Sequence, residues 1–237
     1  MRKLEICCGS IEDVKIAARF NIDSIELNSS LSLGGITPTI GTLRAAKEIT
    51  DIPIYCMNRP VAGGFVYSDV EFDVMLRDGN VLIDNGADGL VFGCLTEQLT
   101  IDLDKTKELI DLAHKRGKLA IFHMAMDSTP DMESSYRMLI ELGINRVLTS
   151  GRGKTAVEGL PMLKRLHEIN PDRLIIGSGV HKESVHHFSQ FKYLHGSCKT
   201  TVYRNNGTAE KNHDYVGKNL QHQADPVCIE ALLKAIK

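Results

Sequence analysis

The sequence has no run of about 18 apolar residues, and its N-terminus has no apolar core followed by a cleavage site. We therefore expect no membrane span and a cytoplasmic location. Charge of one sign is not in excess either, because 28 basic residues stand against 30 acidic ones without a long block of either. The net charge of -2 gives no electrostatic basis for binding nucleic acid or an anionic membrane surface. The expected partners are small molecules and further copies of the chain, that is, a homo-oligomer.

The sequence also lacks a Cys-x-x-Cys motif and the dense cysteine spacing of a small secreted fold. Its six cysteines, at positions 7, 8, 56, 94, 198 and 228, are scattered over the whole length. Cys7 and Cys8 are adjacent, and a disulfide between neighbouring residues is strained. We therefore expect reduced thiols.

No linker divides the 237 residues, so we predict one domain over residues 1–237. Short apolar runs typical of strands occur at 4–8, 24–28, 52–59, 89–93, 118–123, 146–149, 173–176 and 193–195. Helical patterns follow them at 10–20, 39–49, 68–85, 102–116, 129–142, 157–169, 182–191 and 226–236. The polar stretch 199–224 between the last strand and the last helix is expected to be irregular.

Eight alternations of strand and helix without a hairpin signal favour an α/β fold, a single (β/α)8 TIM-type barrel. The alternative is an open doubly wound sheet. The nucleotide fingerprint of that fold is missing, because the segment 8–10 after the first strand lacks three spaced glycines.

In a parallel barrel, functional side chains come from the carboxyl ends of the strands and the loops after them. The alternation along each strand predicts that Glu5, Glu26, Arg59 and His123 point inward, and Asp127 follows four residues after the histidine. Together they would form an acid/base and anion-holding catalytic set. Two alternatives stay open: the buried charges form a structural ion-pair network, and Asp127 caps a turn.

The segment 149–155 is similar to a phosphate loop, but Leu148 occupies the position of the first glycine, which argues against nucleotide hydrolysis. Its backbone amides, and those of the glycine-rich segment after the seventh strand, would still suit an anion near the usual phosphate position of barrels. A plain turn is the alternative. The predicted cofactor-binding residues are Ser150, Gly151, Gly177 and Gly179.

Cys7 and Cys8 are the candidates for a soft metal ion such as copper(I), which prefers thiolate ligands. Successive side chains of a strand point to opposite sides, so one ion cannot easily bind both thiols. The alternative is that both cysteines are part of the apolar core.

A series of motifs occurs in the same order as in the CutC family of copper homeostasis proteins, which the chain resembles over about residues 3–198. The motifs are LEICC at 4–8, SIEL at 24–27, GGITP at 34–38, RP at 59–60, YSDVE at 67–71, GLV at 89–91, FH at 122–123, RVLTSG at 146–151 and HHF at 186–188. The resemblance implies a TIM-type barrel, a cytoplasmic location and a role in copper handling. The family's site residues correspond to Glu5, Cys7, Glu26, Arg59, His123 and Asp127.

The chain departs from the family pattern at Asn28, where a cysteine is common, and at Met124, where an arginine is common. With one thiol fewer, we expect at most weak binding of copper(I) through Cys7. Two hypotheses follow: a CutC-like copper homeostasis protein, or a TIM-barrel enzyme that acts on a small polar or anionic substrate beneath a lid at 60–67.

Overall fold

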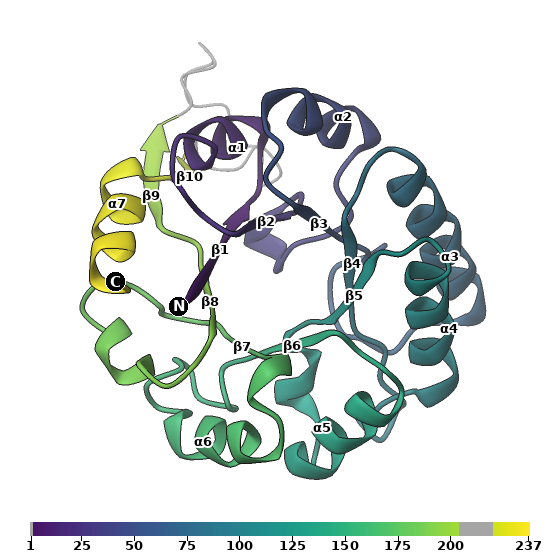
Figure 1. Cartoon of the computed structure of the whole chain (residues 1–237). Coiled ribbons are helices and arrows are strands. Elements are labelled where there is room, and N and C mark those ends of the chain that lie inside the picture. Colours follow the sequence, from purple (N-terminus) through teal and green to yellow (C-terminus); the bar gives the residue numbers. More distant parts are fainter. Residues whose placement is uncertain (1, 204–219) are drawn as a thin grey trace, which may run out of the picture.

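The computed structural model describes residues 2–203 and 220–237. Eight parallel strands close into a barrel in sequence order, so the predicted TIM-type barrel is confirmed (Figure 1). The strands are β1 (Lys3–Cys8), β2 (Ser24–Leu27), β3 (Ile54–Met57), β4 (Gly89–Phe92), β5 (Leu119–Phe122), β6 (Arg146–Thr149), β7 (Leu174–Ile176) and β8 (Tyr193–Gly196).

A ring of helices surrounds the barrel (Figure 1). The α-helices are α1 (Ile11–Ala17), α2 (Ile40–Ile49), α3 (Asp69–Asp84), α4 (Leu103–His114), α5 (Met132–Glu141), α6 (Leu160–Ile169) and α7 (Pro226–Ala235). Short 3-10 helices are η1 (Leu31–Leu33), η2 (Met124–Ser128), η3 (Pro171–Arg173) and η4 (Val185–Phe188). None of the helices in these described ranges combines the length and the apolar character that a bilayer crossing needs.

Side-chain caps explain where the helices begin. The capping box of Ser68 and Glu71 starts α3 at the beginning of the predicted range 68–85. The carboxylate of Asp102 caps α4 by accepting from the amide of Lys105. The expected helix over 182–191 is wrong, because only η4 forms there. Ser184 and His181 bond to each other through side chain and backbone, and such local bonds compete with an α-helical ladder.

Alternation along the strands divides the core into two parts. Inside the barrel lies a small apolar cluster that includes Tyr55, Met57 and Ile121. A larger cluster, which includes Ile6 and Cys8, fills the space between the barrel and the helices. Each such fully buried apolar side chain contributes about 1.5–3 kcal/mol relative to exposure. Polar residues at inward positions, such as Glu5 and Ser24, bond to each other inside the barrel.

An antiparallel hairpin follows the barrel, formed by β9 (Lys199–Tyr203) and β10 (Leu220–Ala224). The expectation of an irregular segment is wrong at these two ends, and residues 204–219 of that segment lie outside the described residues. The β-branched residues of β9 were a strand signal that the polar composition concealed. Asp13 of α1 ties the hairpin to the barrel, because its carboxylate accepts from the amides of Ala224 (2.8 Å) and Gly9 (2.9 Å).

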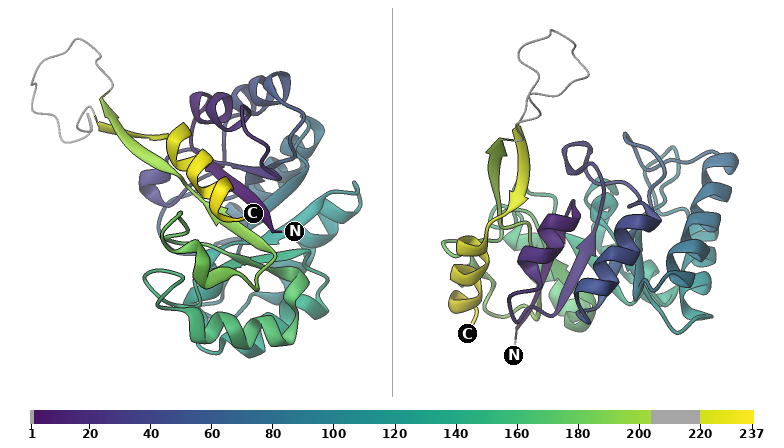
Figure 2. Two further views of the ribbon diagram at one scale, coloured as in Figure 1. Left: turned by 60° about the vertical axis from the view of Figure 1, so that its left-hand side comes forward. Right: turned by 90° about the horizontal axis from the view of Figure 1, so that it is seen from above.

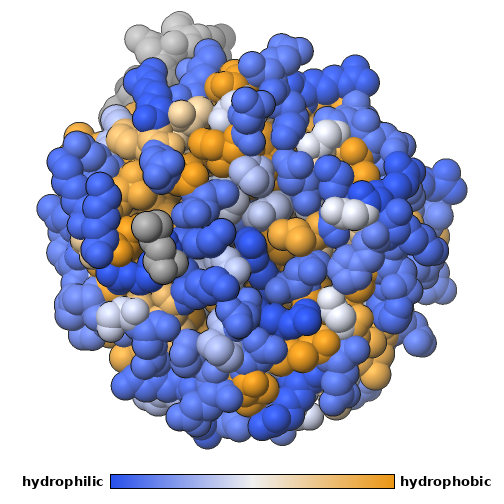
Figure 3. All heavy atoms as spheres, viewed as in Figure 1, coloured by the Kyte–Doolittle hydropathy of each residue, from blue (hydrophilic) through white to orange (hydrophobic). Residues whose placement is uncertain are grey.

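The hairpin rises past the carboxyl-end face of the barrel, whereas both chain termini lie at the opposite, amino-end face (Figure 2). On the amino-end face, hydrophilic side chains predominate and apolar ones are scattered among them (Figure 3). Such a surface is ordinary for a protein face in contact with water. The hairpin thus stands beside the end of the barrel where functional groups are expected.

Candidate functional site

A cavity of about 200 Å³ lies at the carboxyl ends of the strands. Four of the predicted site residues, Cys7, Glu26, Arg59 and His123, line it, and the last three are buried. The lining includes Cys7, Glu26, Asn28, Met57, Arg59, Phe65, His123, Met124 and His195. The cavity therefore combines sulfur, imidazole and carboxylate groups in one place.

Cys7, Glu26 and His195 form a compact cluster in this cavity. Their ligand atoms, one from each residue, all lie within 4.8 Å of one another. Cys7 is opposite Glu26 in the register of β1 and β2, and its Sγ lies 3.6 Å from Glu26 Oε1. The amide of Asn28 donates to Glu26 Oε1 (2.8 Å) and to Cys7 Sγ (3.5 Å). Such a donor set can hold a metal ion.

The sequence placed His195 in the last strand but not in the site. The strand pattern could have predicted an inward position for this histidine, because it alternates with Tyr193. It also stands near the carboxyl end of β8, as His123 does after β5. Glu5, its partner in the register of β1 and β8, accepts from His195 Nδ1 at 2.9 Å. Ser24 Oγ donates to the other Glu5 oxygen at 2.9 Å. Glu5 thus fixes the ring so that Nε2 remains for Cys7 or a ligand.

The cluster has unusual protonation equilibria. Burial raises the pKa of the Cys7 thiol to about 12, with a further rise from Glu26 that His195 partly opposes. Burial also raises the pKa of Glu26. For His195, burial acts to lower the pKa, but Glu26, Cys7 and Glu5 together hold it well above its ordinary value. These shifts favour the protonated forms of all three groups when no metal ion is bound.

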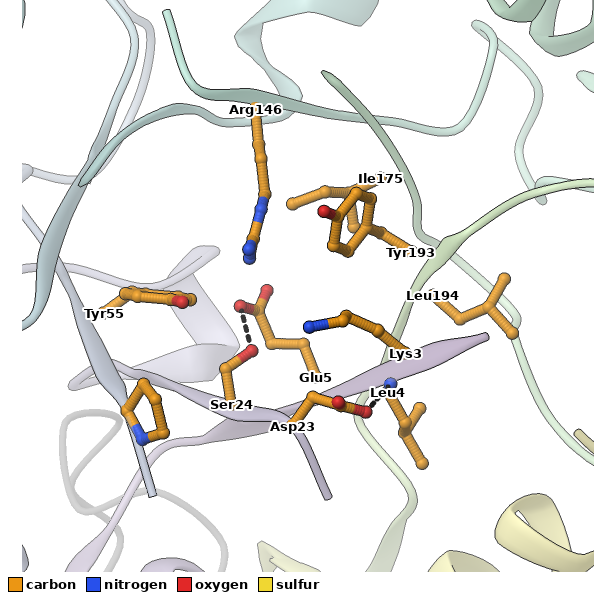
Figure 4. A pocket seen from close by; sticks show the side chains of 11 residues that line it. Lys3, Leu4, Glu5, Asp23, Ser24, Tyr55, Arg146, Ile175, Tyr193 and Leu194 are labelled. Atoms are coloured by element: carbon orange, nitrogen blue, oxygen red, sulfur yellow. Dashed lines mark hydrogen bonds between the residues drawn. The ribbon is translucent and has the colours of Figure 1, made fainter. Parts of the chain in front are cut away.

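Glu5 lies deeper in the barrel than the other predicted site residues, between the cluster and a second cavity of about 120 Å³ at the amino end. Figure 4 shows Lys3, Arg146 and Glu5 pointing toward one another in this second cavity. The Arg146 guanidinium lies 4.3 Å from the ring centroid of Tyr193 and also contacts the Tyr55 ring. Glu5 therefore influences the cavity at the carboxyl ends of the strands through its hydrogen bond to His195.

The guanidinium of Arg59 serves mainly to hold two loops. It donates to the carbonyls of Leu33 (3.1 Å), Gly35 (2.9 Å) and Gly63 (2.6 Å). The ring of Phe65 lies over it, 5.1 Å from the guanidinium carbon. Only Nε of this side chain is left without a partner among the described residues. The loop at 60–67 that was expected to act as a lid is thus fastened over the cavity.

His123 is held by a backbone amide, because its Nδ1 accepts from Ala125 N at 3.1 Å. Its Nε2 therefore carries the hydrogen, and no acceptor for it is found in the described part of the chain. The Phe65 ring lies 4.8 Å from the imidazole. Burial, aided by the nearby Arg59, lowers the pKa of His123 to about 3. At neutral pH this side chain is a neutral hydrogen-bond donor.

This low pKa predicts a dependence of stability on pH. Between pH 6.5 and about 3, the unfolded chain binds a proton at His123 and the folded chain does not, so the free energy of unfolding falls as the pH falls. The contribution is about 1.4 kcal/mol per pH unit. Urea denaturation at a series of pH values should show a steeper decline for the wild type than for His123→Gln. Parallel curves for the two proteins would mean that the folded protein also protonates this histidine.

Asp127 does not join the cavity. Its carboxylate accepts from Thr149 Oγ1 (2.6 Å), from the amide of Arg152 (2.7 Å) and from the amide of Ser150 (3.1 Å). The amide of Gly151 is also used, because it donates to Thr149 Oγ1 at 2.9 Å. The anion site predicted at Ser150 and Gly151 is thus filled by a carboxylate of the chain itself.

The remaining predicted site residues, Cys8, Gly177 and Gly179, do not line the cavity of about 200 Å³. Cys8 is fully buried in the cluster between barrel and helices, on the other side of β1 from Cys7. At Gly177 an added Cβ would lie 2.6 Å from Leu148 Cδ1, so this glycine allows close packing. Gly179, with φ of +72°, lines a third cavity of about 700 Å³, to which Cys7 and His195 also contribute.

Comparisons with known proteins agree with this description. The model of the CutC family matches residues 2–200. A family protein CutC of Treponema denticola is 46% identical over 180 residues, which are 75% of this chain and 72% of the relative. The human copper homeostasis protein cutC homolog is 42% identical over 176 residues, 74% of this chain and 64% of that protein.

A solved structure shows the same similarity in three dimensions. The crystal structure of a Streptococcus agalactiae protein described as a copper homeostasis protein CutC superposes with a TM-score of 0.77 at 30% identity. The superposition covers 83% of this chain and 99% of that chain. The barrel described above is therefore shared with a solved relative.

Proposed function

The chain belongs to the CutC family, and from this premise we propose that the protein takes part in copper homeostasis by binding copper(I) at the carboxyl end of its barrel. The observation that carries the proposal is the approach of Cys7, Glu26 and His195, whose ligand atoms all lie within 4.8 Å of one another. Copper(I) is a soft ion that prefers thiolate, thioether and imidazole ligands. Cys7 and His195 supply two of these three ligand types.

The surroundings of the cluster also fit a bound cation. Glu26 Oε2 is buried without a hydrogen-bond partner among the described residues, which is costly unless a ligand completes the site. Met57 and Met124 line the same cavity and add two thioether side chains to its lining. In this proposal, Cys7 and His195 bind the ion, Glu26 balances its charge, and Glu5 orients the imidazole.

The alternative, an acid/base enzyme, has less support from the geometry. Arg59 was expected to hold an anionic group, but three backbone carbonyls already use its guanidinium. Asp127 is bound by the segment after β6. His123, with a pKa of about 3, cannot take up a proton at neutral pH as a general base.

Removal of the two central ligands tests the proposal. We expect Cys7→Ser to weaken copper(I) binding about 100-fold and His195→Gln about 10-fold, because each loses one soft ligand of a small set. Competition with a chromogenic copper(I) chelator under anaerobic conditions measures both affinities. The matched control is Cys56→Ser, which removes a buried thiol of the outer core instead and should retain the wild-type affinity.

Circular dichroism of each variant separates lost binding from lost folding. An affinity that survives Cys7→Ser, or a wild type that takes no copper(I) from the chelator, would contradict the proposed site.

A further inference from the structure

The copper site proposed above contains a single thiol, that of Cys7, among its three clustered groups. Copper(I) is bound most firmly where two or more soft ligands converge. Cys7 and His195 of this cluster also line the third cavity, whose volume of about 700 Å³ is within the range of roughly 300–1,000 Å³ for small-molecule sites. A ligand in this cavity would touch the same Cys7 and His195 that face the metal position.

The lining of this cavity also includes groups that bind anions. Lys182 and Lys199 both line it, and Lys199 has no acidic partner within the described ranges. Lys182 forms an ion pair with Glu183, with 3.4 Å between Nζ and Oε1. The cavity thus offers to a negatively charged ligand the ammonium group of Lys199, for which the described residues supply no carboxylate.

Backbone amides of the lining residues add further hydrogen-bond donors for an anion. The amide nitrogens of Ser178, Gly179 and Val180 donate no hydrogen bond to other residues in the part of the chain that the structure describes. Ser178 and Gly179 both have left-handed backbone conformations, with φ of 73° and 72°, and the first is unusual for a residue with a side chain. They follow β7, and the loops after the seventh and eighth strands are where barrels often bind phosphate and similar anions.

The lining also includes apolar residues, among them Val180, Val227 and Ala231. The cavity therefore combines soft metal ligands, apolar surface and cationic, donor-rich groups. A ligand that matches this combination carries both a sulfur and a carboxylate or another anionic group.

We propose that the third cavity binds a small anionic thiol that carries copper(I), and that the sulfur of this carrier completes the coordination of the ion at Cys7 and His195. The inference rests on the proposed function and names the molecule that brings the metal. In the exchange, a copper ion bound by two carrier thiolates loses one of these Cu–S bonds and gains a bond to Cys7 Sγ. The proton of the Cys7 thiol passes to the released thiolate, and the proton on His195 Nε2 passes to solvent as that nitrogen binds the ion. The second carrier stays bound, and copper remains copper(I).

The test uses glutathione as the probe, because it combines one thiol with two carboxylates. Wild-type protein is first loaded with copper(I) from a thiol-free chelator and then titrated anaerobically in a calorimeter. We expect glutathione to bind at least about 10-fold more tightly than S-methylglutathione, which keeps the charges without the thiol, or 2-mercaptoethanol, which has a thiol without carboxylates. X-ray absorption at the copper edge should show one additional sulfur ligand after glutathione is added.

The anionic end is tested with a charge reversal. Lys199→Glu should weaken the binding of glutathione to the copper-loaded protein about 10-fold, because attraction becomes repulsion at the carboxylates. The control Lys115→Glu changes an exposed lysine at the end of α4 and should stay within about twofold of the wild type.

Three results would overturn the inference. Equal affinities of S-methylglutathione and glutathione for the copper-loaded protein would mean that the cavity binds the anionic groups without using the thiol. Removal of copper by glutathione without a ternary complex would mean that the thiol does not bind the ion in the protein. Both results leave the copper site itself intact, whereas a protein that takes no copper from the thiol-free chelator would refute the proposed function as well.

Discussion

Replacing Arg59 with methionine is expected to lower the free energy of unfolding by about 3–5 kcal/mol, because three charge-assisted hydrogen bonds of a buried guanidinium are lost together. These bonds join the carbonyls of Leu33, Gly35 and Gly63, which belong to two separate loops. Methionine fills a similar volume but donates no hydrogen bond. The carbonyls would therefore have to find water, and both loops should open locally.

Urea denaturation measures the loss of stability for Arg59→Met, and hydrogen exchange locates it. The amides of residues 33–37 should exchange faster, whereas those of the barrel strands should keep their protection. The matched control is Arg77→Met on α3, whose exposed guanidinium pairs with Asp73 and whose replacement should cost less than about 0.5 kcal/mol. Loops that keep their protection in Arg59→Met would show that the three hydrogen bonds do not hold them.

The same substitution links stability to the site. Gly35 packs closely against Asn28, since an added Cβ at Gly35 would lie 2.5 Å from Asn28 Oδ1. Asn28 in turn donates to Cys7 and Glu26. Opening of the loop should therefore also weaken copper(I) binding, although Arg59 is not one of the proposed ligands.

Replacing Asp127 with alanine is expected to lower the free energy of unfolding by about 3 kcal/mol or more. The carboxylate satisfies Thr149 Oγ1 and the amides of Ser150 and Arg152, and the first two of these residues are buried. Alanine would leave these donors without an acceptor. Chemical denaturation monitored by circular dichroism measures the change, and Asp127→Asn, which retains one acceptor oxygen, should lose about half as much.

This pair of variants also separates a structural role of Asp127 from a functional one. Because the side chain is engaged by the segment after β6, the affinity for copper(I) should stay within a few-fold of the wild type while the protein is folded. An Asp127→Ala variant with native stability and lost ligand binding would restore the functional interpretation of this residue.

The amino-acid sequence by itself determined the barrel and much of its inner surface. Eight apolar runs that alternate with capped helices leave few folds open, because each parallel strand pair needs a crossover on the same face. Alternation along the strands then placed Glu5, Glu26 and Cys7 inside and Cys8 outside. These are local properties of the chain, with a period of two residues, and they can be read without knowing any distance.

Only the tertiary structure decided which polar groups meet. His195 lies 190 residues from Glu5, and the two are neighbours because β8 closes the barrel onto β1 in one register. The partners of Arg59 are loop carbonyls, and those of Asp127 include two loop amides. No side-chain pattern in those loops specifies their paths. In the folded protein, Arg59 and Asp127 of the expected catalytic set hold loops in place, and His195 lies beside Cys7. The sequence could not predict these contacts, because contacts between distant segments depend on register and loop path and not on local sequence.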